Sequence, residues 1–215
     1  MSPERFVAVS SSPLVRPCAD AVVAALTAGN RAVRVYEANG TGGRWLEADV
    51  LAGRVAAVID LSLTELAAEL LGVPGGAGPD RLTAAALRGV PQVIVPGGLD
   101  AVRVATTIPD RRHATFEGVD YLRTTPAEND RLGRDIANKA SAARGPTTIV
   151  LPRGGLSALD GSGRPFHWPE ANFALIQSLR NWLGPGVAVV EFAAHVNDAA
   201  FSAELVAIVP ERSRD

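Results

Sequence analysis

Short apolar runs alternate along the chain with turns rich in glycine, proline, serine or aspartate, and then with stretches of helical periodicity. This rhythm is typical of βαβ units, in which helices join buried parallel strands. Seven short runs rich in β-branched residues are predicted to be strands, over residues 6–9, 32–36, 55–59, 93–95, 119–123, 147–151 and 187–191. Helices are predicted over residues 16–28, 43–52, 65–71, 81–88, 126–143, 169–183 and 198–209. The pattern therefore predicts an α/β fold with a Rossmann-like parallel sheet and helices on both faces.

Length and composition fit a single hydrophobic core. The chain has 215 residues, of which 47% are hydrophobic and 20% are charged, so one α/β domain over residues 1–215 is expected. Residues 97–118 lack a clear period and contain Pro109 and the basic run Arg111, Arg112 and His113. This segment is predicted to be a long functional loop, with a disordered connector as the alternative.

Charge and residue usage exclude several classes of function. Lys plus Arg is 21 and Asp plus Glu is 23, a formal net charge of -2, so no nucleic-acid partner is expected. The single Cys18 and three scattered histidines give no metal-ligand spacing, and no structural metal is predicted. The apolar runs are too short to span a membrane, and no signal peptide is recognised at the start, so a cytoplasmic protein is expected.

Open parallel sheets bind ligands at the carboxyl ends of their strands, so the residues after each predicted strand are candidates for function. A glycine-rich turn follows the second strand and leads into a helix. Its N–H groups, the helix dipole and an arginine favour an anion, and the predicted phosphate-binding residues are Gly40, Thr41, Gly42, Gly43 and Arg44. A tight turn without a ligand is the alternative, because the run has neither the lysine of a Walker loop nor the third glycine of the dinucleotide fingerprint.

Other strand ends carry glycines and hydroxyl groups at the same predicted edge. The further ligand-binding residues predicted there are Gly97, Gly98, Thr124, Gly154, Gly155 and Ser157. Arg123 lies where a strand becomes a helix, and it is predicted to clamp a carboxylate or phosphate through paired hydrogen bonds. Thr125 to Glu128 has the sequence of a capping box, so Glu128 is predicted to cap the helix rather than to act as a base.

A histidine near the end of the chain is the candidate for acid–base chemistry. His195 follows the last predicted strand and is predicted to carry protons, with Glu191 or Asp198 orienting it. These three residues are the candidate catalytic group of a hydrolase or lyase. No serine lies in a nucleophile elbow of the G-x-S-x-G type.

Six sets of residues, taken in order along the chain, resemble the tomato mosaic virus resistance protein family. They are YEANGTGGR (36–44), GPDRL (78–82), VPQVI with GGLD (90–100), LRTTPAE (122–128), LPRGGLS with GRPF (151–166) and HVND (195–198). The resemblance implies a Rossmann-like domain that binds ATP, in an uncharacterised microbial branch. It also implies that plant members of the family bind a viral replication helicase. Mg²⁺ held by carboxylates, as the counter-ion of a bound nucleotide, is left open by the residues.

The resemblance covers only the second of the two α/β subdomains that typical members of the family have. A homo-oligomer, or a separate chain that supplies the first subdomain, is therefore expected. Two departures bear on the ligand: Glu37 stands where the family commonly has a histidine, and His113 is followed by Ala114 where the family has a His-Asn-Pro string.

Three functions are open at this point. The first is binding of ATP, or of another phosphate- or carboxylate-bearing small molecule, at the carboxyl edge of the sheet. The second is a hydrolase or lyase that uses His195 as general acid or base. The third is a protein-interaction module.

Overall fold

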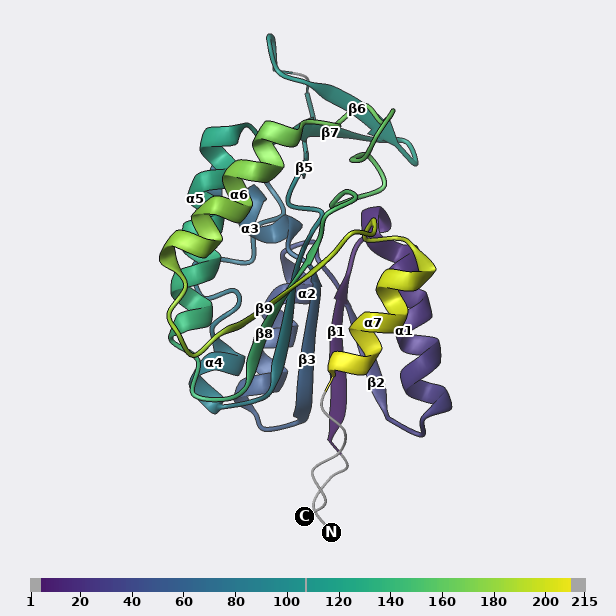
Figure 1. Cartoon of the computed structure of the whole chain (residues 1–215), viewed down its shortest axis with the longest axis vertical. Coiled ribbons are helices and arrows are strands. Elements are labelled where there is room, and N and C mark those ends of the chain that lie inside the picture. The colour runs from purple at the N-terminus through teal and green to yellow at the C-terminus, as the bar shows by residue number, and fades with distance from the viewer. Residues whose placement is uncertain (1–4, 107, 210–215) are drawn as a thin grey trace.

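A six-stranded parallel sheet forms the centre of the molecule (Figure 1). The computed structural model describes residues 5–106 and 108–209. The strand order is β2-β1-β3-β4-β8-β9. These strands are β1 (Phe6–Ser11), β2 (Val33–Glu37), β3 (Val55–Ser62), β4 (Gln92–Gly97), β8 (Thr147–Pro152) and β9 (Ala188–Phe192). Because the chain passes from β1 outward to β2 and then back to β3 on the other side of β1, the strand order reverses between β1 and β3.

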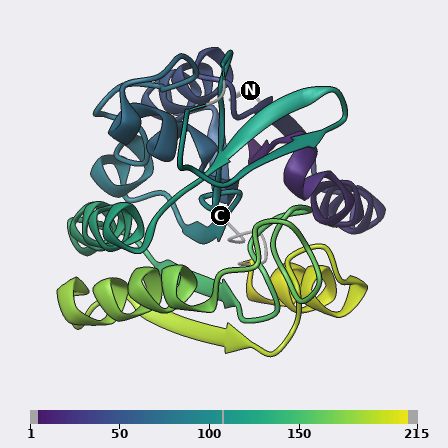
Figure 2. The same ribbon diagram turned by 90° about the horizontal axis from the view of Figure 1, so that it is seen from above.

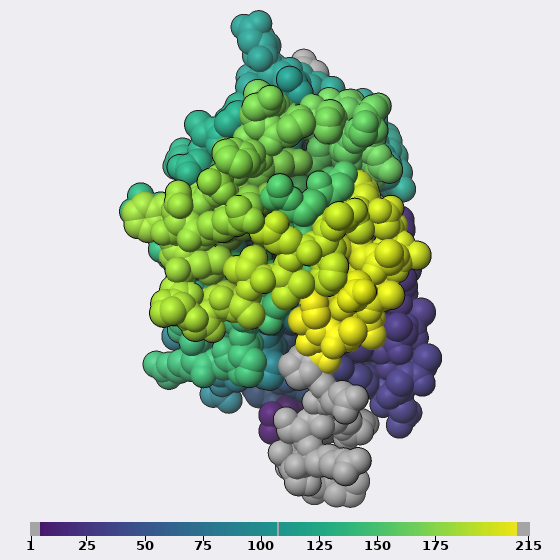
Figure 3. All heavy atoms as spheres, viewed as in Figure 1, coloured from purple at the N-terminus to yellow at the C-terminus, as the bar shows by residue number. Residues whose placement is uncertain are grey.

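Helices cover both faces of this sheet, as Figure 2 shows from above. A short 3-10 turn, η1 (Pro13–Val15), leads into α1 (Arg16–Ala28), which packs with α7 (Ala199–Ile208) on one face. The other face is covered by α2 (Thr41–Leu51), α3 (Thr64–Leu71), α4 (Ala84–Arg88), α5 (Pro126–Ser141) and α6 (Pro169–Trp182). In Figure 3 the residues from α6 to α7, green to yellow, form much of the visible surface, and this stretch includes the largely exposed edge strand β9. The predicted Rossmann-like α/β fold is confirmed.

Consecutive residues of a central strand contribute to different cores. In β4, Val93 and Val95 pack with α1 and α7, whereas Ile94 packs with α3, α5 and α6. Since both faces are covered, the central strands are continuously apolar, which explains why the sequence pattern finds them. None of the helices in the described part of the chain has the length and apolar character needed to cross a membrane.

A second, smaller sheet lies above the carboxyl ends of the main sheet (Figures 1 and 2). It consists of β5 (Ala101–Arg103), β6 (His113–Phe116) and β7 (Val119–Arg123), paired antiparallel in the order β5-β7-β6. The prediction that residues 119–123 belong to the parallel sheet is therefore wrong. Glu117 and Gly118 both have positive φ, at 48° and 74°, and form the two-residue turn of a β-hairpin. That hairpin makes β7 the antiparallel neighbour of β6.

The segment 97–118 is consequently not one irregular loop. It contains the end of β4, then β5 and β6, with irregular chain between the last two. At the carboxyl end of β7 the chain enters α5 through the predicted capping box, which is confirmed. The Thr125 side chain accepts from the Glu128 N–H at 3.3 Å, and the Glu128 carboxylate accepts from the Thr125 N–H at 2.7 Å.

Candidate functional site

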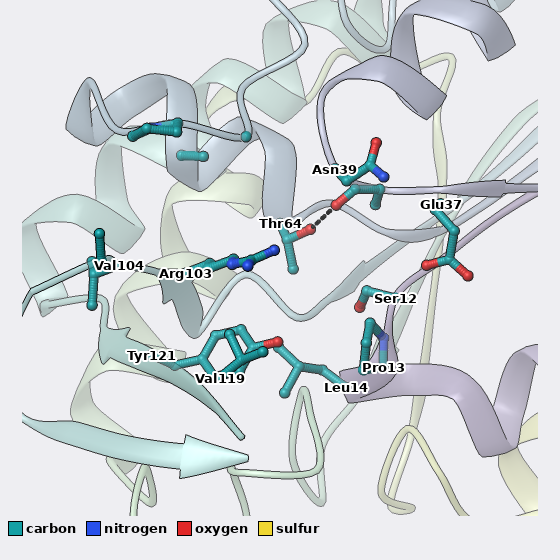
Figure 4. A pocket seen from close by; sticks show the side chains of 15 residues that line it. Ser12, Pro13, Leu14, Glu37, Asn39, Thr64, Arg103, Val104, Val119 and Tyr121 are labelled. Atoms are coloured by element: carbon teal, nitrogen blue, oxygen red, sulfur yellow. Dashed lines mark hydrogen bonds between the residues drawn. The ribbon is translucent and has the colours of Figure 1, made fainter. Parts of the chain in front are cut away.

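A cavity of about 580 Å³ lies between the carboxyl edge of the main sheet and the small sheet (Figure 4). It opens at the point where the strand order reverses, the usual location of ligands in open α/β sheets. Its volume is in the range of small-molecule sites. The lining residues are Ser12, Pro13, Leu14, Glu37, Ala38, Asn39, Thr64, Ala68, Pro74, Gly75, Arg103, Val104, Ala105, Val119 and Tyr121.

The small sheet contributes a cation and a phenol to this cavity. Arg103 and Tyr121 are register partners across β5 and β7, and both line the cavity. Arg103 makes no hydrogen bond or ion pair with any residue that the structure describes. Burial raises the pKa of the Tyr121 hydroxyl, with Arg103 opposing that shift, so the hydroxyl keeps its proton at neutral pH. Both groups are therefore available as hydrogen-bond donors to a ligand.

The opposite wall, at the carboxyl edge of the main sheet, contributes two hydroxyl groups and a carboxylate. The Thr64 hydroxyl donates to the Ala38 carbonyl at 3.0 Å, drawn as a dashed line in Figure 4. The Ser12 hydroxyl accepts from that of Ser62 at 2.9 Å, which leaves its own proton available. Glu37 ends β2, and its carboxylate lies 4.0 Å from Arg16, with both side chains half exposed. An exposed pair at this distance is weak, so Glu37 can accept from a ligand.

The predicted phosphate turn binds an anion from its own chain. The N–H groups of Gly40 and Gly43 donate to one oxygen of the buried Glu65 carboxylate, at 2.6 and 3.0 Å. The Gly42 N–H donates to the Asn39 side chain at 3.1 Å. These amides are not free for an external phosphate, and the alternative of a tight turn is the better description. The prediction erred because the sequence does not reveal which carboxylate folds onto the turn.

Arg44 and Thr41 also form hydrogen bonds within the chain. Arg44 is exposed and donates to the Gly76 carbonyl at 3.2 Å and to the Thr41 hydroxyl at 3.3 Å.

At Gly42 a side chain would overlap the Glu37 carbonyl group, and at Gly43 it would overlap the Glu65 carboxylate. The glycines are therefore required by packing.

A fully buried arginine completes the surroundings of Glu65. Arg81 donates to Glu65 at 2.7 Å, to Glu47 at 3.0 Å, and to Asp60. Burial lowers the pKa of Arg81, but the three carboxylates more than reverse that shift, so the guanidinium stays charged. Burial raises the pKa of Glu47, partly offset by Arg81. This group fixes the α2, α3 and α4 segments to β3.

Arg123 and Thr124 are structural residues rather than ligand clamps. Arg123 is fully buried, and its guanidinium donates to the Phe166 carbonyl at 2.9 Å, the Asn172 side chain at 2.7 Å and the Thr124 hydroxyl at 3.0 Å. Thr124 in turn donates to the Leu99 carbonyl at 3.0 Å. The predicted clamp is contradicted because these internal acceptors already occupy all three nitrogens of the guanidinium.

Ser157 belongs to a buried network with two carboxylates. Its hydroxyl donates to Asp100 at 2.6 Å, while Asp160 accepts from the Leu156 N–H at 2.9 Å and from Asn172 at 2.7 Å. Both carboxylates are fully buried, and each has one oxygen without a hydrogen-bond partner. Burial raises the pKa of Asp100 to about 6, with Arg123 opposing and Asp160 reinforcing that shift. Ser157 is thus enclosed, and it does not line the cavity.

The predicted catalytic group does not assemble. The His195 Nδ1 accepts from the Asn197 N–H at 3.0 Å, so Nε2 carries the proton and donates to the carbonyls of Ser157 and Asp160, both at 2.9 Å. Asp198 accepts from the His195 backbone N–H at 2.8 Å rather than from the ring. Glu191 lies on the edge strand β9 and pairs with Arg180 and Arg153. The imidazole is therefore a buried connector between loops, which is a correction of the acid–base prediction.

The remaining predicted glycines allow close approach of chain segments. A side chain at Gly97 would overlap the Leu61 carbonyl, and one at Gly154 or Gly155 would overlap the backbone around Ala194 or Asp160. Gly98 has a φ of 71° and faces Thr64, Ser62 and Ser12, so it lies beside two residues that line the cavity. None of the four donates to the cavity in the way that a phosphate loop would.

The cavity-lining residues Arg103 and Tyr121 are not among the predicted site residues. The prediction of a functional segment over 97–118 includes Arg103, but nothing in the local pattern distinguishes it from the neighbouring arginines Arg111 and Arg112. In the structure Arg111 pairs with Glu128 at 2.8 Å, and Arg112 lies over the Trp168 ring, with 4.1 Å from its guanidinium carbon to the ring centre. The antiparallel register of β5 with β7 is the missing information.

Comparisons with known proteins identify a family and several relatives of this chain. Residues 4–212 match the family described as an uncharacterised protein family (UPF0261), C-terminal domain. A UPF0261 protein of Clostridium tetani is 35% identical over 181 residues, which are 79% of this chain and 44% of that protein. The ToMV resistance protein Tm-1(GCR237) of Solanum lycopersicum is 33% identical over 211 residues, 93% of this chain and 28% of that protein. The chain thus spans less than half the length of these two relatives.

Among solved structures, the esterase domain from a Rhodothermus marinus protein aligns with a TM-score of 0.43 and 15% identity. The alignment covers 96% of this chain and 85% of that one. A likeness this distant carries no argument about activity.

Proposed function

The chain belongs to the UPF0261 family, whose C-terminal domain it matches, and we propose that it binds a small organic anion in the cavity above β1 and β3. The observation that carries the proposal is Arg103, a cation without a partner among the described residues, at the wall of that cavity. A guanidinium in this position favours a carboxylate or a phosphate group. Tyr121 and Ser12 offer hydroxyl protons to the same ligand.

The start of α3 supports the anion end of this site. Thr64 is the first residue of that helix and lines the cavity. The first N–H groups of a helix have no partner within the helix, and the positive end of its dipole lies there. Arg103 and the positive end of the helix dipole therefore both attract an anion.

ATP stays a prediction from the family resemblance, and Mg²⁺ as the counter-ion of a bound nucleotide is left open by the residues. Two observations favour a ligand with fewer charges: the glycine-rich turn already holds Glu65, and Glu37 adds a negative charge to the cavity. Within residues 5–106 and 108–209, no group of three or more histidine, cysteine or acidic side chains is placed to hold a metal ion. We propose that one carboxylate or phosphate monoester fits better than a triphosphate.

Binding without acid–base turnover by His195 is part of the proposal, because both of its ring nitrogens are used by backbone groups.

The expectation of a homo-oligomer, or of a separate chain that supplies the first subdomain, stays a prediction. Light scattering over a wide concentration range tests it: a constant mass of one 22.4 kDa chain would contradict it. A protein-interaction role is tested by the same measurement with the candidate partner added.

Titration of the protein with small anions tests the proposed function. Inorganic phosphate, ATP, ADP and a series of alkanoates would be titrated while backbone amide NMR signals are followed. We expect at least one anion to shift signals of residues around the cavity and to bind about tenfold or more weakly to Arg103→Gln, since a charge-assisted hydrogen bond is lost. Arg88→Gln is the control, because Arg88 is exposed in the last turn of α4, at the opposite edge of the sheet. Equal binding by wild type and Arg103→Gln, or no binding of any anion, would overturn the proposal.

A further inference from the structure

We propose that the ligand of the cavity is dipolar: it carries its anionic group at Arg103 and a cationic amine at Glu37, with an apolar body between them. This inference rests on the proposed function and adds the class of ligand to it. The observation behind it is a pair of opposite charges that line one cavity without pairing with each other.

The two charged side chains come from different sheets. Arg103 is on β5 of the small sheet, and Glu37 is the last residue of β2 in the main sheet. In Figure 4 they lie on opposite sides of the cavity, with Thr64 and Ser12 between them. A ligand that reaches from one to the other therefore has to present opposite charges at its two ends.

Arg103 and Glu37 differ in what else could satisfy them. Arg103 has no hydrogen-bond or ion-pair partner among the described residues. Within the described part of the chain, the Glu37 carboxylate has only Arg16 as a partner, at 4.0 Å, and that guanidinium is half exposed to water. A ligand amine could replace this weak surface contact at little cost. In contrast, a second anionic group at Glu37 would be repelled, so the carboxylate selects against diacids.

The surface between the two charges is largely apolar. Leu14, Val119 and the ring of Tyr121 lie on one side of the cavity, and Ala38 and Ala68 also line it. The hydroxyl groups of Ser12, Thr64 and Tyr121 are polar groups that line the space between Arg103 and Glu37. A hydrocarbon body with few polar atoms fits such a surface, because it removes apolar area from water without leaving polar groups unpaired.

An ω-amino acid series is the probe for this inference. 4-Aminobutanoate, 6-aminohexanoate and 8-aminooctanoate would be titrated beside the alkanoate and the alkylamine of the same chain length, with affinities measured by NMR. The series varies the separation of the two charges, so that one member can match the span of the cavity. We expect at least one amino acid to bind about tenfold more tightly than both of its singly charged analogues.

Two substitutions of Glu37 identify the residue responsible. In Glu37→Gln the amino acid and its alkanoate should bind equally. In Glu37→Lys the preference should reverse, so that hexanedioate binds more tightly than 6-aminohexanoate. Glu204→Lys is the control for added charge, because Glu204 is exposed on α7 and does not line the cavity. Thermal unfolding midpoints near that of the wild type would show that the variants fold.

The outcomes separate this inference from the proposed function. If alkanoates bind through Arg103 as tightly as the amino acids do, the dipolar ligand is wrong and anion binding stands. The same conclusion follows if Glu37→Lys leaves the preference unchanged. If no acid of either series binds, and phosphate and the nucleotides also fail, both proposals are overturned.

Discussion

Arg103 and Tyr121 lie directly opposite each other across the antiparallel strands β5 and β7, so their side chains leave the small sheet on the same face. That face forms one wall of the cavity. The pairing explains how a residue from an irregular part of the sequence and a residue from a clear strand come to serve the same site. It also places Tyr121 next to Arg103, the residue proposed to bind the anion.

Replacing Tyr121 by phenylalanine should weaken the binding of an anionic ligand by about three- to tenfold, the value of one hydrogen bond. Stability should hardly change, because no hydrogen bond joins the Tyr121 hydroxyl to the described residues. The chain's other tyrosine is a matched control: the Tyr36 hydroxyl donates to Asp49. Tyr36→Phe should lower the free energy of unfolding by about 1–3 kcal/mol and leave ligand affinity unchanged. Ligand titration and urea unfolding of both variants would check this pair of outcomes.

Substitution of Gly42 by valine should prevent folding rather than weaken phosphate binding. The new Cβ would overlap the Glu37 carbonyl group, and neither backbone segment can move freely. A second variant tests the same turn with less disruption. Glu65→Gln removes the charge that accepts from Gly40, Gly43 and Arg81, and should cost about 2–4 kcal/mol of unfolding free energy. Circular dichroism in urea measures both effects; a fully stable Gly42→Val protein would contradict the packing argument.

The sequence predicts the parallel sheet and its helices well because these elements have regular periods. Residues 16–28 form α1 as predicted, and the doubly covered strands β3 and β8 contain continuous apolar runs, over residues 55–59 and 149–151. The edge of the sheet at which the cavity lies could also be predicted, since it follows from the parallel arrangement of the strands. Positions next to a strand end could therefore be selected as candidates.

What the sequence could not supply is the partner of each polar side chain. Arg123 and Arg103 both lie in the small sheet, yet one is fully buried on internal acceptors and the other faces the cavity. Their difference depends on Phe166 and Asn172, which come from a distant loop and helix. The predicted roles of His195 and of the glycine-rich turn differ from the structure for the same reason. A polar group with an internal partner gives the same sequence signal as one that is free to bind a ligand.

His195→Ala should destabilise the protein by about 1–3 kcal/mol while leaving ligand affinity at the cavity unchanged. The loss arises because the carbonyls of Ser157 and Asp160 and the Asn197 N–H each lose a partner. Nitrogen NMR of the imidazole should report the tautomer with the proton on Nε2. A variant that keeps its stability but loses a catalytic activity would restore the acid–base role.

Asp100 should make the protein less stable as the pH rises from about 4 to about 6. Burial raises the pKa of its folded-state carboxyl to about 6, with Asp160 reinforcing and Arg123 opposing, from an ordinary value of 3.8. Between these two values the folded state binds more protons than the unfolded state, so unfolding free energy falls as pH increases and levels off above the folded-state pKa. The stabilising contribution is fully present below pH 3.8, and its loss amounts to at most about 3 kcal/mol.

Comparison with Asp100→Asn isolates this contribution, because the variant retains every other titrating group. The difference in unfolding free energy between wild type and variant, measured by urea unfolding at several pH values, should decrease from pH 4 to pH 7. Asp49 gives the opposite sign: burial would raise its pKa, but hydrogen bonds from Tyr36, Arg54 and Arg34 lower it overall. The contribution of Asp49 is therefore present above its ordinary pKa and is lost as pH falls through the lowered value, so the same subtraction with Asp49→Asn should increase with pH at the acidic end. A flat difference for Asp100→Asn would mean that the unpartnered Asp100 oxygen is solvated well enough to stay ionised.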